Sequence, residues 1–313
     1  MKIVSRLLIF SYYGYEGVGY LRKLYVCSTS SDCISKVNLD LFIEEEKIYL
    51  DKKNLKKIGP HGIYVYENKL ITANSYDNSI SMVDIDNCQT ESYFIGMHCN
   101  DLSVYDNKAY VICGDCDDII VFDLEKRHIV EAIPCGNLPH SIYICKRKNL
   151  IIVANMNSDS ITIIECAPNG NIKNLRVGAY PTKALITPDG NYILVCESNI
   201  GMDNKGSISI ISLKNYNVLY NVPVGNSPVD MYCNERYCYI SNFGDGTVSV
   251  LDINNYKEIK KIKIGGMPRG ILEDEKYLYV GDNYNNLLFR IDKLTENKKA
   301  ISIGGEPTGM TLL

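Results

Sequence analysis

The chain has 313 residues, 46% of them hydrophobic, and a formal net charge of −4 from 33 basic and 37 acidic residues. This composition is ordinary for a globular protein, and the slight acidic excess argues against general binding to nucleic acid or to an anionic membrane surface. No stretch approaches the roughly 20 apolar residues of a membrane-spanning helix. We therefore expect neither a nucleic-acid partner nor a membrane partner.

The first 20 residues are rich in Tyr and Gly and precede the regular part of the sequence. Arg6 interrupts their apolar run and no small-residue cleavage site follows, so they match a signal peptide poorly. We predict an arm or an extra strand at 1–20 and a single domain at 21–313. Cytoplasmic localisation is the expectation, with secretion or surface display as the alternative.

From residue 21 onward, short apolar runs alternate with turns. Three runs come first, at 24–28, 34–38 and 47–50, and from residue 60 a unit of four runs recurs, beginning with 62–66, 70–74 and 79–84. The runs hold 4–6 residues, are rich in Ile, Val and Tyr, and are separated by Gly, Asn and Asp. This pattern predicts strands, and no helical periodicity of comparable strength is present.

Each unit is marked by a β-branched residue, a Gly, and a Pro or its stand-in three residues after that Gly. The marker glycines are Gly96, Gly136, Gly178, Gly225, Gly265 and Gly304, at intervals of 40, 42, 47, 40 and 39 residues. A degenerate copy stands at 58–60. A period of about 40 residues with four strands in each unit predicts an all-β repeat fold, the β-propeller.

The two ends of the chain complement each other. Residues 307–313 supply a marker and one innermost strand, whereas the first three runs lack an innermost strand. We predict that 309–313 pairs with the run at 24–28 in one sheet, which closes the ring and removes two exposed sheet edges. The expected fold is a seven-bladed β-propeller of four-stranded blades.

The second run of several units ends in a small polar residue, as in Ile-Thr-Ala-Asn74, Ile-Val-Ala-Asn155 and Tyr-Ile-Ser-Asn242. With the Gly-x-x-Pro markers, these endings make the chain resemble the YVTN-repeat β-propellers (YncE-like) over residues 21–313. The resemblance implies a binding or surface-associated protein, and related seven-bladed proteins include a lactonase acting on 6-phosphogluconolactone. The chain has no Trp, which argues against WD-type blades and quinoprotein dehydrogenases.

The twelve cysteines lie mostly inside apolar runs, where free Cys behaves as a small buried hydrophobic residue. We expect them to be reduced, without a stabilising disulfide, as in a reducing cytoplasm. The one Cys-x-x-Cys, at Cys113 and Cys116, lacks the second pair or the His partners of a zinc site. We predict no metal site and no cofactor.

Familiar catalytic motifs are missing from the sequence, including the Gly-x-Ser-x-Gly elbow, His-Glu-x-x-His and the P-loop. Polar residues instead follow the Pro slot in several units, and the repeat places these positions around the channel at one of its mouths. The predicted ligand-binding residues are His61, Asn100, Asp101, His140, Lys183, Asp230 and Arg269. No residue is assigned a catalytic role.

The first hypothesis for function is a monomeric binding or interaction scaffold that holds a small polar or anionic ligand, or a protein loop, at the channel mouth. Arg269 and Lys183 would anchor an anion. The alternative is a lactonase or related hydrolase with His61 or His140 as general base and Arg269 or Lys183 at the oxyanion. A structural or surface protein is the third possibility, in which these side chains only cap strand starts and bond to one another.

Overall fold

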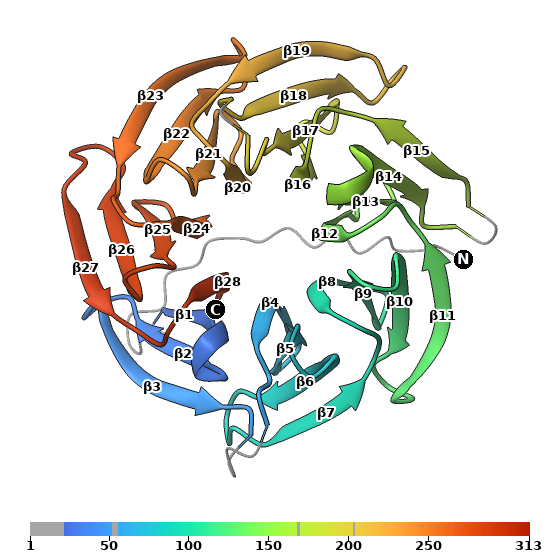
Figure 1. Ribbon diagram of the computed structural model, residues 1–313. Coiled ribbons are helices and arrows are strands. Elements are labelled where there is room, and N and C mark those ends of the chain that lie inside the picture. The colour runs from blue at the N-terminus through green and yellow to red at the C-terminus, as the bar shows by residue number, and fades with distance from the viewer. Residues whose placement is uncertain (1–21, 52–55, 168–169, 203) are drawn as a thin grey trace, which may run out of the picture.

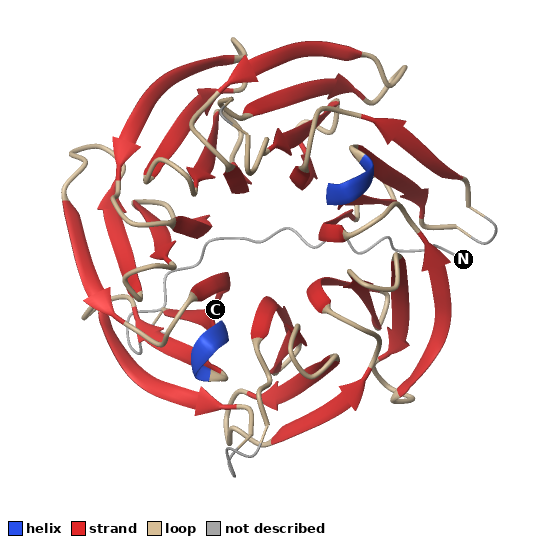
Figure 2. Ribbon diagram, viewed as in Figure 1, coloured by secondary structure: helices blue, strands red, loops and turns tan. Residues whose placement is uncertain are grey.

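A computed structural model of the protein describes residues 22–51, 56–167, 170–202 and 204–313, so the predicted arm at 1–20 lies outside the described residues. The described chain forms seven antiparallel sheets of four strands each, arranged as blades around a central axis (Figure 1). Figure 2 shows that the only helical elements among these residues are two short turns, η1 (Thr29–Ser31) and η2 (Met156–Ser158). The predicted all-β, seven-bladed fold is therefore confirmed.

Each blade is built from consecutive strands, except the one that joins the two ends of the chain. That blade holds β28 (Pro307–Leu312), β1 (Lys23–Ser28), β2 (Cys33–Asn38) and β3 (Ile43–Tyr49). The other blades are β4 (Pro60–Tyr66), β5 (Lys69–Asn74), β6 (Ser79–Asp84), β7 (Thr90–Phe94); β8 (Cys99–Tyr105), β9 (Lys108–Cys113), β10 (Asp118–Asp123), β11 (His128–Pro134); β12 (Pro139–Cys145), β13 (Leu150–Asn155), β14 (Ser160–Glu165), β15 (Ile172–Arg176); β16 (Pro181–Ile186), β17 (Tyr192–Glu197), β18 (Ser207–Ser212), β19 (Val218–Pro223); β20 (Pro228–Cys233), β21 (Tyr237–Asn242), β22 (Thr247–Asp252), β23 (Lys257–Lys263); and β24 (Pro268–Glu273), β25 (Tyr277–Asp282), β26 (Leu287–Asp292), β27 (Lys298–Ser302).

The ring closes through the pairing that the sequence predicts. β28 pairs antiparallel with β1, with Leu312 opposite Leu24 and Met310 opposite Val26. Both β1 residues are fully buried, and Met310 packs against the same hydrophobic cluster. Closure therefore covers the inner edge of β1 and also fills the space between this blade and its neighbour.

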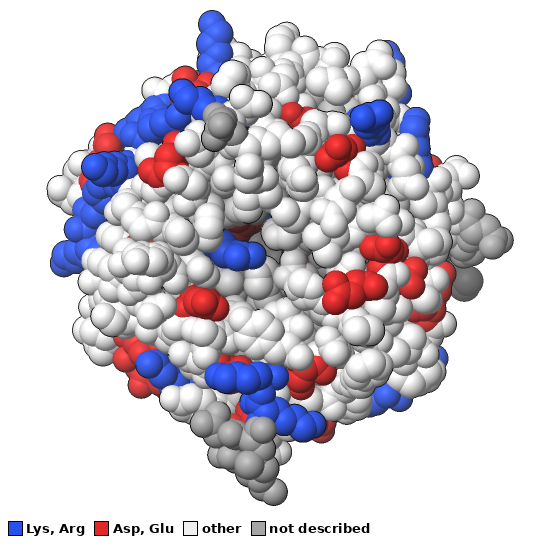
Figure 3. All heavy atoms as spheres, viewed as in Figure 1, with Lys and Arg blue, Asp and Glu red and all other residues white. Residues whose placement is uncertain are grey.

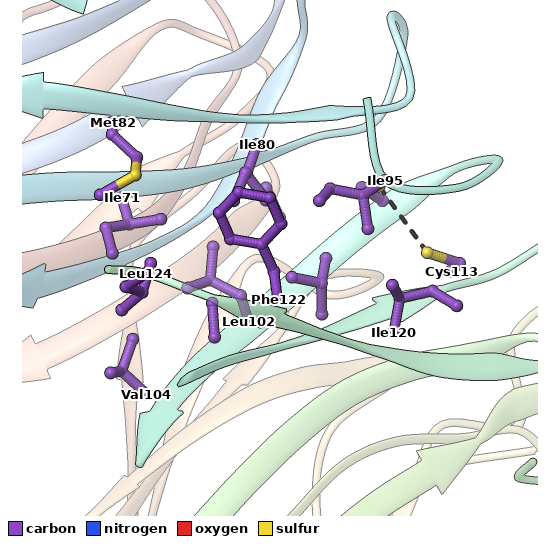
Figure 4. Close-up of a cluster of buried hydrophobic side chains, with 14 residues drawn as sticks. Ile71, Ile80, Met82, Ile95, Leu102, Val104, Cys113, Ile120, Phe122 and Leu124 are labelled. Carbon is purple, nitrogen blue, oxygen red and sulfur yellow. Dashed lines mark hydrogen bonds between the residues drawn. The ribbon is translucent and has the colours of Figure 1, made fainter. Parts of the chain in front are cut away.

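The hydrophobic core lies between adjacent blades rather than in one central mass. Figure 4 shows the cluster between the β4–β7 and β8–β11 blades, where Ile80 and Met82 of β6 meet Leu102 of β8 and Phe122 of β10. These side chains are at most 3% exposed, and burying each one contributes about 1.5–3 kcal/mol. Successive side chains of a strand point to opposite faces of its sheet. The largely apolar middle strands therefore pack against both neighbouring blades.

Several blades also contain a buried polar cluster where the second strand ends. The Nδ2 group of Asn74 donates to the hydroxyl groups of Ser79 and Ser81, both at 2.8 Å, and Asn155 and Asn242 make equivalent contacts with the third strands of their blades. The repeated Asn therefore ties the second strand to the third. Glu197 occupies this position in the β16–β19 blade.

The cysteine prediction is wrong at one pair. Cys233 and Cys238 face each other at the end of the β20–β21 hairpin and form a disulfide. Six of the other ten cysteines are buried, as expected for small apolar residues within strands. In the described part of the chain, no helix has the length and apolarity needed to cross a membrane.

Candidate ligand-binding site in the axial channel

Two adjoining cavities, which share several lining residues, occupy the axis of the ring, and Figure 3 shows the central hollow on one face. The outer cavity, of about 380 Å³, lies where the inner strands begin, and Tyr76, Leu138 and Met156 are among its lining residues. The inner chamber, of about 620 Å³, extends along the inner strands. Both volumes fall in the range of small-molecule sites.

The seven sequence-predicted residues are divided between these two spaces. Asn100 lines the outer cavity only. Asp101, Lys183 and Asp230 line the inner chamber only, and His61, His140 and Arg269 line both. The last three, with Thr308, therefore stand at the junction of the two cavities, and the set extends through the channel instead of crowding one mouth.

A local break in strand pairing explains why consecutive residues face the channel. All seven inner strands show a register shift just after their first residue, so that His61, Asn100 and His140 are extra residues in the ladder. A bulge re-aims side chains because two residues oppose one. This is why Asn100 and Asp101, adjacent in sequence, both reach the channel, one to each cavity.

In β24 and β28, the residue directly after the bulge residue is a glycine. A Cβ atom at Gly270 would lie 1.9 Å from the carbonyl oxygen of Thr308, and one at Gly309 would lie 2.5 Å from the carbonyl oxygen of His61. Only glycine permits this close approach of neighbouring inner strands. The charged side chains Asp101, Lys183 and Asp230 are thereby restricted to the opposite part of the wall.

The bulge side chains also connect the blades to one another. Each donates a hydrogen bond to a backbone carbonyl near the start of the next inner strand. The links are Thr308 to His61 (3.1 Å), His61 to Asn100 (2.8 Å), Asn100 to His140 (3.0 Å), His140 to Thr182 (2.7 Å) and Thr182 to Pro228 (2.8 Å). This relay is a structural role for several predicted site residues. It does not extend through Val229 or Arg269.

The relay fixes the tautomers of the two channel histidines. Because a carbonyl oxygen only accepts, Nδ1 carries the proton in both His61 and His140, and Nε2 is an acceptor. Burial and the nearby charge of Arg269 hold the pKa of His61 well below its ordinary value of 6.5 and lower the pKa of His140 to about 4. Both imidazoles are neutral at pH 7.

The depressed histidine pKa values predict acid sensitivity. A histidine that is neutral in the fold and has a pKa near 6.5 when unfolded binds more protons in the unfolded state between pH 6.5 and pH 4. Stability should therefore fall as the pH falls through this window, and His140 should contribute about 2 kcal/mol of the loss between pH 7 and pH 5. Denaturant titrations of wild type and His140→Gln at both pH values test this.

The matched control is His128→Gln, because His128 is exposed on the outer strand β11. The control should keep the wild-type difference in stability between the two pH values, and His140→Gln should reduce it. Equal differences in all three proteins would contradict the assignment of a neutral, partly buried His140.

Arg269 is the basic group at the junction. Its guanidinium donates to Nε2 of the neutral His61 at 2.8 Å. Burial lowers the pKa of Arg269, and Asp230 and Glu306 oppose that shift, yet an arginine remains charged. Neither of these acids, nor any other among the described residues, forms an ion pair with this guanidinium. Arg269 is thus a partly buried cation in the channel wall without a direct counter-ion among the described residues.

Lys183 is placed differently. Its ammonium group lies 3.3 Å from Asp230 and 3.8 Å from Asp101. Although burial opposes the shift, these two carboxylates raise the pKa of Lys183 above its ordinary value. Burial raises the pKa of Asp101 in turn, because the nearby lysine compensates only part of the desolvation. With one ammonium and two carboxylates, the triad has a formal net charge of −1, so Lys183 is a weaker anchor for an anion than the sequence suggests.

Several residues that line the outer cavity are not among the ligand-binding residues predicted from the sequence. Tyr76 and Met156 follow second strands, and Leu138 precedes a marker Pro, so the repeat places all three on the face where the inner strands begin. Their position in the repeat was an available signal. Their contact with the channel depends on loop conformations that the repeat pattern does not specify.

No model of a known protein family and no curated protein sequence matches the chain. Solved structures do resemble it. A functionally unknown protein from Desulfotomaculum acetoxidans matches over 93% of this chain and 98% of its own, with 15% identity and a TM-score of 0.78. A putative 6-phosphogluconolactonase from Bacteroides fragilis matches over 96% and 100%, with 13% identity and a TM-score of 0.75.

A catalytically inactive histidine-to-alanine variant of virginiamycin B lyase from Staphylococcus aureus, solved with quinupristin, is also similar. It matches over 82% of this chain and 89% of its own, with 18% identity and a TM-score of 0.70. At such identities the likeness concerns the fold, because one propeller scaffold hosts many functions. The sheet order and these likenesses together establish that the chain is a seven-bladed β-propeller.

Proposed function

We propose that this protein is a ligand-binding β-propeller of the YVTN-repeat type that holds a small ligand with an anionic group in its axial channel. One observation carries the proposal: Arg269, partly buried in the channel wall, has a neutral histidine as its partner and no ion pair among the described residues. A partly desolvated cation without a counter-ion favours an anion, and a carboxylate or phosphate from a ligand would supply one. Lys183 and its two carboxylates would then bind polar groups of the ligand in the inner chamber.

Calorimetric titration with inorganic phosphate and with small carboxylates tests the proposal. Arg269→Ala should weaken binding by about 1–3 kcal/mol, the range for a charge-assisted hydrogen bond, and leave the melting temperature nearly unchanged. Arg236→Ala is the matched control, because Arg236 is exposed in the turn between β20 and β21. If every anion that binds does so equally well to wild type and Arg269→Ala, the proposed site is wrong.

Hydrolysis of a lactone is the second candidate, and the free Nε2 of His140 favours it. In the part of the chain that the structure describes, this nitrogen has no hydrogen-bond partner, and the residue lines both cavities. It would accept a proton from a water molecule whose oxygen attacks the lactone carbonyl. Arg269 would stabilise the oxyanion, the ring C–O bond would break, and the proton would pass to the alkoxide. The structural likeness to the putative lactonase is consistent with this reaction.

A lactone-opening assay separates the two candidates. Enzymatic hydrolysis should proceed above the rate in buffer, fall strongly in His140→Gln and persist in the His128→Gln control. Ligand binding without any lactone opening would reject the hydrolase and leave the binding protein.

A further inference from the structure

The outer cavity contains three kinds of recognition surface close together. Arg269 lies at the junction with the inner chamber, and Glu306 is another of the lining residues. Tyr76, Leu138 and Met156 supply apolar atoms to the same wall. The remaining lining residues are histidines, glycine, proline and small polar residues, so among the described residues the Lys, Arg, Asp and Glu side chains of this lining are one Arg and one Glu.

Glu306 is available for a ligand. Glu306 is only partly buried, and its carboxylate accepts no hydrogen bond and forms no ion pair among the described residues. It is near enough to Arg269 to counter the effect of burial on the pKa of that arginine, yet it makes no direct contact with the guanidinium. A cation and an anion thus line one cavity without pairing with each other, so each can contact a ligand in that cavity.

The apolar side chains of the wall are accessible from the outer cavity. The side chain of Tyr76 is 52% exposed although its ring rests on Gly59, where any Cβ atom would lie 2.6 Å from the ring. Leu138 reaches toward Gly114, where a Cβ atom would be 3.4 Å from its Cδ1. Figure 3 shows mostly uncharged atoms around the central hollow. Apolar surface that is exposed within a concave site is typical of a ligand-binding wall.

We infer that the outer cavity binds an apolar α-amino acid, or a compound with the same three groups, which rests on the proposed anion-binding function of Arg269. The carboxylate contacts Arg269, the ammonium group contacts Glu306, and the apolar side chain packs on Tyr76, Leu138 and Met156. The three groups of the ligand match the three surfaces in charge and polarity. The cavity volume of about 380 Å³ accommodates a molecule of this size.

A series of four probes tests each contact separately: L-phenylalanine, 3-phenylpropanoate, which lacks the ammonium group, phenethylamine, which lacks the carboxylate, and glycine, which lacks the side chain. L-Phenylalanine should bind at least about tenfold more tightly than each of the others, because each lost contact costs about 1.4 kcal/mol or more. Calorimetry on the full chain gives the four affinities.

Two conservative variants assign the contacts. Glu306→Gln should abolish the advantage of L-phenylalanine over 3-phenylpropanoate without weakening 3-phenylpropanoate. Leu138→Asn should reduce the advantage over glycine. Leu138 has a positive φ of 50°, which Asn tolerates, so the fold should be retained. Glu235→Gln, an exposed acid in a turn outside the channel, is the control and should change none of the four affinities.

The outcomes distinguish this inference from the function on which it rests. If 3-phenylpropanoate or phosphate binds through Arg269 but the amino group adds nothing, the amino-acid inference is wrong and the anion site stands. If none of the acidic probes depends on Arg269, both are wrong. Binding of phenethylamine alone, lost in Glu306→Gln, would also overturn the inference, because it would make the cavity a cation site.

Discussion

Removal of residues 307–313 should unfold the protein or make it aggregate. The deletion removes β28, leaves Leu24 and Val26 of β1 without their partners, and opens the cluster in which Met310 and Leu312 pack. The lost burial of two large side chains and the lost ladder hydrogen bonds amount to about 5 kcal/mol or more, a large part of the stability of a typical domain. Size-exclusion chromatography and thermal melting of the truncated chain measure the effect.

A peptide of residues 307–313 added to the truncated chain should restore part of the lost stability, because it can occupy the exposed edge of β1. A peptide of the same composition in scrambled order is the control. A truncated protein that melts at the temperature of the parent would mean that the shared blade contributes little to closure.

Glu197→Ala should destabilise the protein by about 3 kcal/mol, the second large effect. The carboxylate is 5% exposed and accepts hydrogen bonds from the backbone N–H of Gly178 (2.8 Å) and from Ser207 (2.7 Å), Ser209 (2.5 Å) and Asn221 (2.7 Å). Alanine leaves the buried Ser209 and the partly buried Gly178 and Ser207 without this acceptor, whereas the exposed Asn221 can turn to water. Each unsatisfied buried group costs about 1–3 kcal/mol unless the structure relaxes. Denaturant unfolding gives the change in free energy.

Two further variants show whether the hydrogen-bond network is the cause. Glu235→Ala removes an exposed carboxylate outside the network and should change stability by less than about 0.5 kcal/mol. Glu197→Gln retains one carbonyl oxygen and the side-chain volume, so its effect should be smaller than that of alanine. Equal losses in Glu197→Gln and Glu197→Ala would point to the charge, rather than the count of acceptors, as the stabilising feature.

The strand pattern and its period were sufficient to predict the fold, because every blade uses the same local physics. Six of the seven inner strands begin at a Pro of the repeat, including Pro60, Pro139 and Pro307, since proline at the first position needs no ladder partner. The pairing of the chain ends followed from the count of strands in each unit. These features depend on local sequence and recur from blade to blade. An atypical residue in one blade therefore does not obscure the pattern in the others.

The details of the channel could not be predicted in the same way. Repeat symmetry places His61 and Arg269 on one ring, but their contact spans the chain from residue 61 to residue 269 and depends on bulges and rotamers. The pairing of Lys183 with two carboxylates is likewise a contact between blades. The disulfide had a readable signal, since Cys233 and Cys238 flank one hairpin turn, but the apolar setting of the other cysteines masked it.

The hydrogen-bond relay around the channel limits where the ligand site can change. His61, Asn100, His140, Thr182 and Thr308 each tie one inner strand to the next, so a mutation at any of them alters the ring as well as the ligand site. The bulge positions at Val229 and Arg269 lie outside this relay. Substitution of Val229 or Arg269 leaves all five relay bonds in place, so we expect a change of ligand to cost the ring less at these two positions than at the relay residues.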